Sequence, residues 1–300
     1  MITILGPTAT GKTDLAARVA FELNGEVISA DSRQVYRGMD IGTGKDLSTY
    51  AIESQKITYH LIDIAEPGTE YNIYRYQQDF FAVYRDIVKR GRLPVLCGGS
   101  GMYLESVLGG YRLQAIENEG SLKRSLEQKT DAELEKTLRS LKTLHNTTDL
   151  EDRERMIRAI EIASVSGEAT LSKTFPEIQS TLFGIRYPRG LQKTRITERL
   201  KARLNEGLVE ETEALLRKGI APERLIRYGL EYRWVTKYVT GEILYDEMFN
   251  ALNTAIHQFS KRQMTWFRRM ERQGFTILWL DGRWTIQEKM AFIRHHHHLV

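Results

Sequence analysis

Gly6-Pro7-Thr8-Ala9-Thr10-Gly11-Lys12-Thr13 matches the pattern G-x-x-x-x-G-K-[ST] at every fixed position. The apolar run 2–5 before it predicts a buried parallel strand, and the apolar spacing of 12–23 after it predicts an amphipathic helix. Such a loop points backbone N–H groups at phosphate oxygens, and the following helix adds the positive end of its dipole. We therefore predict a phosphate site in which Lys12 neutralises a phosphate and the Thr13 hydroxyl binds Mg²⁺. A chance glycine turn is the alternative, and the flanking strand and helix argue against it.

Strands and helices alternate along most of the chain, which predicts an α/β fold with a parallel sheet flanked by helices. Further strands are expected at 26–30, 59–64, 93–97, 181–186 and 275–280, and helices at 74–89, 191–218 and 245–271. The sequence pattern changes after about residue 110. Helical patterns are found at 121–144 and 149–166, and no strand pattern lies between them. We expect an α/β core of residues 1–114 and 179–300, interrupted by an all-helical insert at 115–178.

Composition is ordinary for a globular protein, with 41% hydrophobic and 27% charged residues in 300. No run approaches the roughly 18 apolar residues of a membrane span, and no signal peptide precedes the first strand. The single cysteine, Cys97, fits a reducing compartment, so we expect a cytoplasmic protein without a membrane partner. The histidines at 295–298 are left out of the functional argument, and no metal is assigned to them.

Basic residues gather in two helical segments. One holds Arg153, Arg155 and Arg158, and the other lies between Lys261 and Arg272. A net charge of +4 permits a polyanionic partner without requiring one. Charge alone favours two solvated helix faces.

The phosphate loop does not identify the reaction by itself. ATPases and kinases usually add an Asp at the end of a second strand, but 93–97 is followed by Gly-Gly-Ser, and Asp63 is the one nearby candidate. Asp31 directly follows the strand at 26–30, where ligands of open α/β sheets bind. It serves either as a base acting on an acceptor molecule or as a cap of the next helix, and the residues alone leave both open.

Several segments together resemble the tRNA dimethylallyltransferases, also called tRNA isopentenyltransferases. The matching segments are 6–13, 31–45 (Asp-Ser-Arg-Gln-Val-Tyr-Arg-Gly-Met-Asp-Ile-Gly-Thr-Gly-Lys), 98–103, 152–161 and 261–268. The resemblance implies a P-loop kinase-like core with a helical insert, and Mg²⁺ as cofactor. It also implies two substrates, dimethylallyl diphosphate and the anticodon stem-loop of a tRNA. The prenyl group would go to N6 of the adenosine 3′ of the anticodon. No Cys/His zinc motif follows near the C-terminus, so the bacterial type is expected, acting as a monomer.

The resemblance also implies roles for individual residues. It makes Asp31, Ser100, Lys12 and Arg227 catalytic, with Ser100 standing where the family usually has threonine. Diphosphate would be bound by Gly6, Pro7, Thr8, Ala9, Thr10, Gly11, Lys12 and Thr13, and the metal by Thr13. The tRNA-binding residues would be Asp31, Ser32, Arg33, Gln34, Glu154, Arg155, Met156, Ile157, Arg158, Arg233, Lys261, Arg262, Gln263 and Arg268. With these assignments, the two basic segments are interpreted as tRNA-binding surfaces and no longer as solvated helix faces.

One segment departs from the family pattern. Glu231 replaces a glycine before Tyr232-Arg233. Arg227 is shifted by one position from the arginine that helps to bind diphosphate in the family, so whether Arg227 takes that role stays open. Two rival functions share the phosphate loop. The first is an adenylate isopentenyltransferase or small-molecule kinase, and the second is a nucleic-acid-binding NTPase. The helical insert and the basic segments argue against an enzyme that acts on a free nucleotide or another small molecule. The presence of Asp31, together with the lack of an aspartate at the end of the strand at 93–97, argues against the NTPase.

Overall fold

The computed structural model describes residues 1–110, 120–141, 150, 153, 156–157, 159–160 and 178–297. By its internal contacts the chain forms two compact units. One consists of Met1–Tyr111 with Pro176–Val300, and the other is Arg112–Phe175. The insert was predicted a few residues further along the chain, at 115–178.

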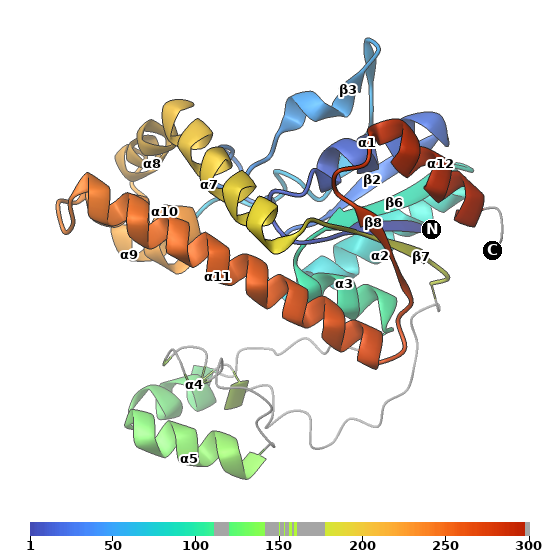
Figure 1. Cartoon of the computed structure of the whole chain (residues 1–300). Helices are drawn as coiled ribbons and strands as arrows, with labels where there is room; N and C mark the ends of the chain where they lie inside the picture. The colour runs from blue at the N-terminus through green and yellow to red at the C-terminus, as the bar shows by residue number, and fades with distance from the viewer. Residues whose placement is uncertain are drawn as a thin grey trace. The chain divides into compact units, whose positions relative to one another are not determined.

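A six-stranded sheet forms the centre of the first unit (Figure 1). Its strand order is β5-β2-β6-β1-β7-β8. The strands are β1 Ile2–Leu5, β2 Gly25–Ala30, β5 Tyr59–His60, β6 Leu93–Gly98, β7 Thr181–Arg186 and β8 Ile277–Asp281. Every neighbouring pair is parallel, as the alternation of strands and helices predicts. All residues of β1 and β2 are buried, which is the expected pattern for parallel strands covered on both faces.

Helices cover both sides of this sheet. Figure 1 shows α1 (Lys12–Glu22) and α12 (Ile286–His297) above it, and α2 (Ile73–Lys89) and α3 (Gly101–Leu108) below it. A 3₁₀ helix at Leu47–Tyr50 and a hairpin of β3 (Ala51–Ile52) and β4 (Gln55–Lys56) follow β2. Among the described residues, no helix is long and apolar enough to cross a membrane.

Five consecutive helices build a separate layer with its own core. They are α7 Arg189–Asn205, α8 Leu208–Arg217, α9 Pro222–Arg227, α10 Leu230–Val239 and α11 Tyr245–Arg272. Leu200, Leu208, Val235, Met248 and Leu252 are among the buried residues of that core. Helix α11 contacts both α10 and α7, and it also reaches α3.

Two predicted elements need correction. The strand expected at 59–64 ends at His60, because Leu61 and Asp63 have φ angles of 61° and 56° and cannot continue an extended ladder. The single helix expected at 191–218 is two helices, α7 and α8. Gly207 separates them with a φ of 104°, a conformation that glycine adopts at little cost.

The second unit contains α4 (Gly120–Glu127) and α5 (Asp131–Leu141) in place of one helical stretch at 121–144. Thr130 and Glu133 begin α5 as a capping box, since the Thr130 N–H donates to Glu133 and the Glu133 N–H donates to the Thr130 hydroxyl. Met156 and Ile157 are buried against Leu126, Leu134 and Leu138. Their apolar side chains fill the core of the insert, and the expected contact of these two residues with tRNA stays a prediction.

Candidate functional site

The phosphate loop connects β1 to α1 and is fixed by neighbours from distant parts of the chain. Lys12 Nζ donates to the Pro7 carbonyl at 2.7 Å, so its stem curls over the loop. From α7, Gln192 Nε2 donates to the Thr8 carbonyl at 2.5 Å and Arg195 Nε to the Ala9 carbonyl at 3.1 Å. Hydrogen bonds from within the protein therefore hold the conformation of the loop.

Gln263, from α11, joins the phosphate loop to the loop after β6. Its Oε1 accepts the Thr8 N–H at 2.8 Å, and its Nε2 donates to the Gly99 carbonyl at 2.9 Å. The side chain is buried, so these bonds place it inside the site. Its expected contact with tRNA stays a prediction.

A pocket opens where the phosphate loop, the turn after β2 and helices α7 and α11 meet. The predicted residues that line it are Thr8, Lys12, Thr13, Asp31, Arg33, Gln34 and Gln263. The other lining residues are Ser29, Thr43, Gly44, Tyr50, Cys97, Gly98, Gly99, Arg199, Arg203 and Phe259. The Asp31 carboxylate and the Lys12 ammonium group thus line one cavity.

The turn that carries Asp31 is held in place by hydrogen bonds. Asp31 Oδ1 accepts the Arg33 N–H at 2.9 Å, and Ser100 Oγ accepts the Ser32 N–H at 3.1 Å. No helix begins at this turn, so the helix-cap explanation for Asp31 does not hold. Ser100, the residue before α3, helps to position the turn, and its catalytic role stays a prediction.

Burial alters the acidity of two groups in the pocket. It lowers the pKa of Lys12 to about 8, and the nearby Arg199 guanidinium lowers it further while Asp31 opposes the change. Burial raises the pKa of the Cys97 thiol to about 12. Cys97 is therefore a thiol at neutral pH, and Lys12 is a cation that is easily deprotonated.

Arg33 points into the site. Its guanidinium pairs with Glu231 at 2.6 Å and lies over the Phe259 ring, 5.7 Å from its centroid. Gln34 also turns inward, since it accepts from the Ser29 hydroxyl at 3.1 Å and donates to the Gly44 carbonyl at 3.1 Å.

Several other predicted residues are not among those that line this pocket. Arg227, Arg233, Lys261, Arg262 and Arg268 are exposed. Glu154, Arg155 and Arg158 lie outside the described residues. Asp63, the alternative metal-supporting aspartate, pairs with the buried Lys45 instead of facing the phosphate loop.

Sequence reasoning missed Arg199 and Arg203, which line the pocket from α7. Their spacing of four residues in a helical pattern was the one available signal, and it is common on solvated helices. Only the packing of α7 against the turn after β2 shows that these two arginines face inward.

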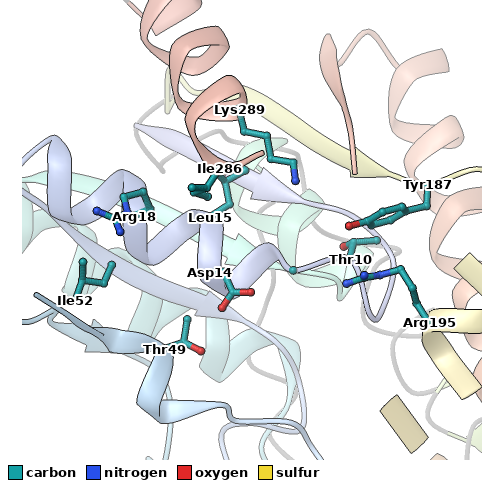
Figure 2. Close-up of a pocket in the computed structure, with 11 residues that line it drawn as sticks. Thr10, Asp14, Leu15, Arg18, Thr49, Ile52, Tyr187, Arg195, Ile286 and Lys289 are labelled. Carbon is teal, nitrogen blue, oxygen red and sulfur yellow. The ribbon is translucent and has the colours of Figure 1, made fainter. Parts of the chain in front are cut away.

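A second cavity of about 360 Å³ borders the loop at Thr10 and Gly11 but includes neither Lys12 nor Asp31. Figure 2 shows Asp14, Arg195 and Lys289 around it. Lys289 donates to the Gly282 carbonyl at 2.9 Å, and burial together with Arg195 lowers its pKa. Lys12 and Asp31, the residues that carry the predicted chemistry, line the other pocket.

Among the described residues, no group of three or more His, Cys, Asp or Glu side chains could hold a metal ion. A metal bound only by protein carboxylates is therefore not supported in this part of the chain. The Thr13 hydroxyl, next to Lys12 in the pocket, fits the other arrangement, in which Mg²⁺ takes one protein oxygen and the remainder from phosphates and water.

The parallel sheet, the phosphate loop and a facing carboxylate define an α/β protein of the P-loop kinase-like class. The IPP transferase family model matches residues 34–270, and an isopentenyl transferase model matches residues 1–62. The chain belongs to the IPP transferase family.

Individual relatives agree with this membership. A tRNA dimethylallyltransferase 2 of Bacteroides fragilis is 54% identical over 98% of this chain and 96% of its own length. A tRNA dimethylallyltransferase 1 of Parabacteroides distasonis is 52% identical over 97% and 95%. The crystal structure of a Staphylococcus epidermidis tRNA isopentenylpyrophosphate transferase is 29% identical, with a TM-score of 0.71 over 99% of this chain and 98% of that one.

Proposed function

We propose that this enzyme transfers the dimethylallyl group of dimethylallyl diphosphate to N6 of the adenosine 3′-adjacent to the anticodon in tRNA. The observation that carries the proposal is one pocket lined by both Lys12 of the phosphate loop and the Asp31 carboxylate. A carboxylate beside bound phosphate is unfavourable unless a cation lies between them, because like charges repel. A carboxylate has a use where an acceptor must lose a proton.

The transfer forms one bond and breaks another. The N6 nitrogen attacks the allylic carbon, the bond from that carbon to the diphosphate oxygen breaks, and the diphosphate leaves with the electron pair. Asp31 accepts the proton that N6 loses. Lys12 and the N–H groups of the phosphate loop stabilise the charge gathering on the leaving group. Mg²⁺, held by the Thr13 hydroxyl, would add a positive charge beside the diphosphate.

The acceptor base has to leave its stack to reach Asp31, as bases do in other nucleobase-modifying enzymes. We assign the surrounding RNA contacts to the exposed Arg233, Lys261, Arg262 and Arg268, together with Arg155 and Arg158 of the insert. Phosphate contacts of this kind position the RNA without reading its sequence. A monomer acting in the cytoplasm, where tRNA is available, is sufficient for this reaction.

The proposal is tested by the choice of acceptor. Purified protein is incubated with Mg²⁺, dimethylallyl diphosphate labelled in its prenyl group, and either an anticodon stem-loop or free AMP. The expected result is label in the stem-loop. Label in AMP alone would instead support an adenylate isopentenyltransferase, the alternative raised by the isopentenyl transferase match at residues 1–62. ATP hydrolysis without prenyl transfer would indicate an NTPase.

A further inference from the structure

Two arginines of α7 lie side by side in the pocket. Arg199 and Arg203 are four residues apart, so they share one face of the helix, and both line the cavity that holds Lys12. A methyl group added at Gly44 would overlap the Nη2 atoms of both. The two guanidinium groups therefore meet at Gly44, and the absence of a side chain there allows them to approach.

Each guanidinium is held by a carboxylate. Asp46 pairs with Arg199 at 3.0 Å, and Glu231 pairs with Arg203 at 3.4 Å while also pairing with Arg33. Glu231 occupies the position where the resemblance predicts glycine, and its side chain is only 4% exposed. A buried carboxylate is tolerated when it is paired, and here it takes a hydrogen bond from each of two arginines.

The pocket nevertheless carries uncompensated positive charge. Burial, and then the neighbouring Arg199, lowers the pKa of Arg203 to about 10, against the opposing effect of Glu231. Arg203 Nη2 is buried and has no hydrogen-bond partner among the described residues. An unpaired buried donor costs free energy, and adjacent like charges repel, so an anion between Lys12 and these arginines would relieve both costs.

We propose that Arg199 and Arg203 form the second half of the diphosphate site, with Lys12 and the phosphate loop as the first half, and that Glu231 is the positioning residue that holds Arg203. This inference rests on the proposed function. It gives to Arg203 the role that the resemblance assigned to Arg227, which is exposed and does not line the pocket. Glu231, in the place of the family's glycine, and Arg203 in the pocket then act together as a pair.

Calorimetric titration of the whole protein with pyrophosphate and Mg²⁺ tests the proposal. Arg203→Met is expected to raise the Kd for pyrophosphate roughly 10- to 100-fold, because one charged donor to the anion is lost. Arg203→Lys should fall between that variant and the unchanged protein, because it keeps the charge but not the planar donors. The matched control is Arg217→Met, on the exposed side of α8, which should leave the Kd unchanged.

Thermal unfolding separates binding from a purely structural role. Without ligand, the Tm of Arg203→Met should not fall. Glu231 still has its ion pair with Arg33, and the repulsion between the guanidinium groups of Arg199 and Arg203 disappears. The rise in Tm on adding pyrophosphate should shrink, because the ligand binds less tightly. A folded Arg203→Met that binds pyrophosphate as tightly as the unchanged protein overturns the proposal. If Arg203→Met does not fold, Arg199→Met takes its place, with the same expected and contradicting results.

The role of Glu231 is tested by combining changes. Glu231→Gln alone should raise the Kd for pyrophosphate about three- to tenfold. In a protein that already carries Arg203→Met, the same change should raise the Kd by less than about twofold. Independent, additive effects would show that Glu231 does not act through Arg203. Failure of the unchanged protein to bind pyrophosphate would count against the proposed function itself. Equal binding by the unchanged protein and by the arginine variants would remove only this inference.

Discussion

The proposed chemistry depends most on Asp31, because it is the carboxylate that shares a pocket with Lys12. Asp31→Ala should reduce prenyl transfer by roughly 100-fold or more, since the proton acceptor is lost. The affinity for an anticodon stem-loop should change by less than about threefold, because one carboxylate contributes little to a basic RNA surface. Single-turnover kinetics and filter binding measure the two quantities separately.

The control for this change is Asp86→Ala, which removes an exposed aspartate of α2 that pairs with Arg90. It should alter neither transfer nor RNA affinity. Normal turnover by Asp31→Ala would show that the carboxylate only shapes the turn through its bond to the Arg33 N–H.

Lys12 makes phosphate binding depend on pH. Its pKa is lowered to about 8, first by burial, so the free protein loses this cation as the pH rises through that value. Because binding an anion requires the charged form, pyrophosphate affinity should fall by up to about tenfold per pH unit above about pH 8. Titrations from about pH 7 to 9.5 measure this slope. Lys12→Gln should bind more weakly and show a flatter profile, and equal slopes would assign the titration to another group.

Single residues were predictable from the sequence where a local pattern defines them. The phosphate loop and Asp31 follow strands directly, and parallel strands place their carboxyl ends along one edge. Arg203 could not be predicted, because its inward direction depends on Glu231, which is distant in sequence. Met156 and Ile157 are buried in the core of the insert, as their apolar character would suggest, and their contact with RNA stays a prediction from the motif.

At the scale of elements, Glu211 of α8 clamps the loop that follows the Asp31 turn. Its carboxylate accepts the N–H groups of Asp40, Ile41 and Gly42 at 2.7–3.0 Å and the Tyr232 hydroxyl at 2.7 Å. Glu211→Gln should lower the free energy of unfolding by about 2 kcal/mol, because several charge-assisted bonds lose the ionised acceptor. Urea unfolding measures the loss. Glu213→Gln, on the exposed side of the same helix, is the control, and an equal effect of both changes would exclude the clamp.

Elements were predictable where hydrophobic periodicity runs unbroken. β1 and β7 have the predicted bounds, since both are short apolar strands beside glycine or polar residues. The strand at 59–64 was overestimated, because the positive φ angles of Leu61 and Asp63 depend on contacts that no local pattern shows. Helices α9 and α10 were not predicted, since α10 depends on packing against α8 and α11, and α9 on packing against α10.

At the scale of the whole molecule, RNA binding should depend on salt through the exposed cations of α11. Arg262→Ala should weaken binding to every stem-loop sequence alike, and it should reduce the slope of log affinity against log salt by about 1. Arg217→Ala, which removes an arginine paired with Glu213 on α8, is the control. An unchanged slope for Arg262→Ala would show that Arg262 lies on a solvated helix face and does not contact RNA.

The central claim is that the phosphate loop holds the group that leaves while the prenyl group moves to the RNA. Dimethylallyl diphosphate carrying one label in the prenyl carbons and another in the phosphorus tests this in a single reaction with an anticodon stem-loop. The account predicts that the carbon label appears in the RNA at N6 of the adenosine next to the anticodon, and that the phosphorus label is released in equal amount as pyrophosphate. Phosphorus label in the acceptor, or release of pyrophosphate without carbon label in the RNA, would contradict it.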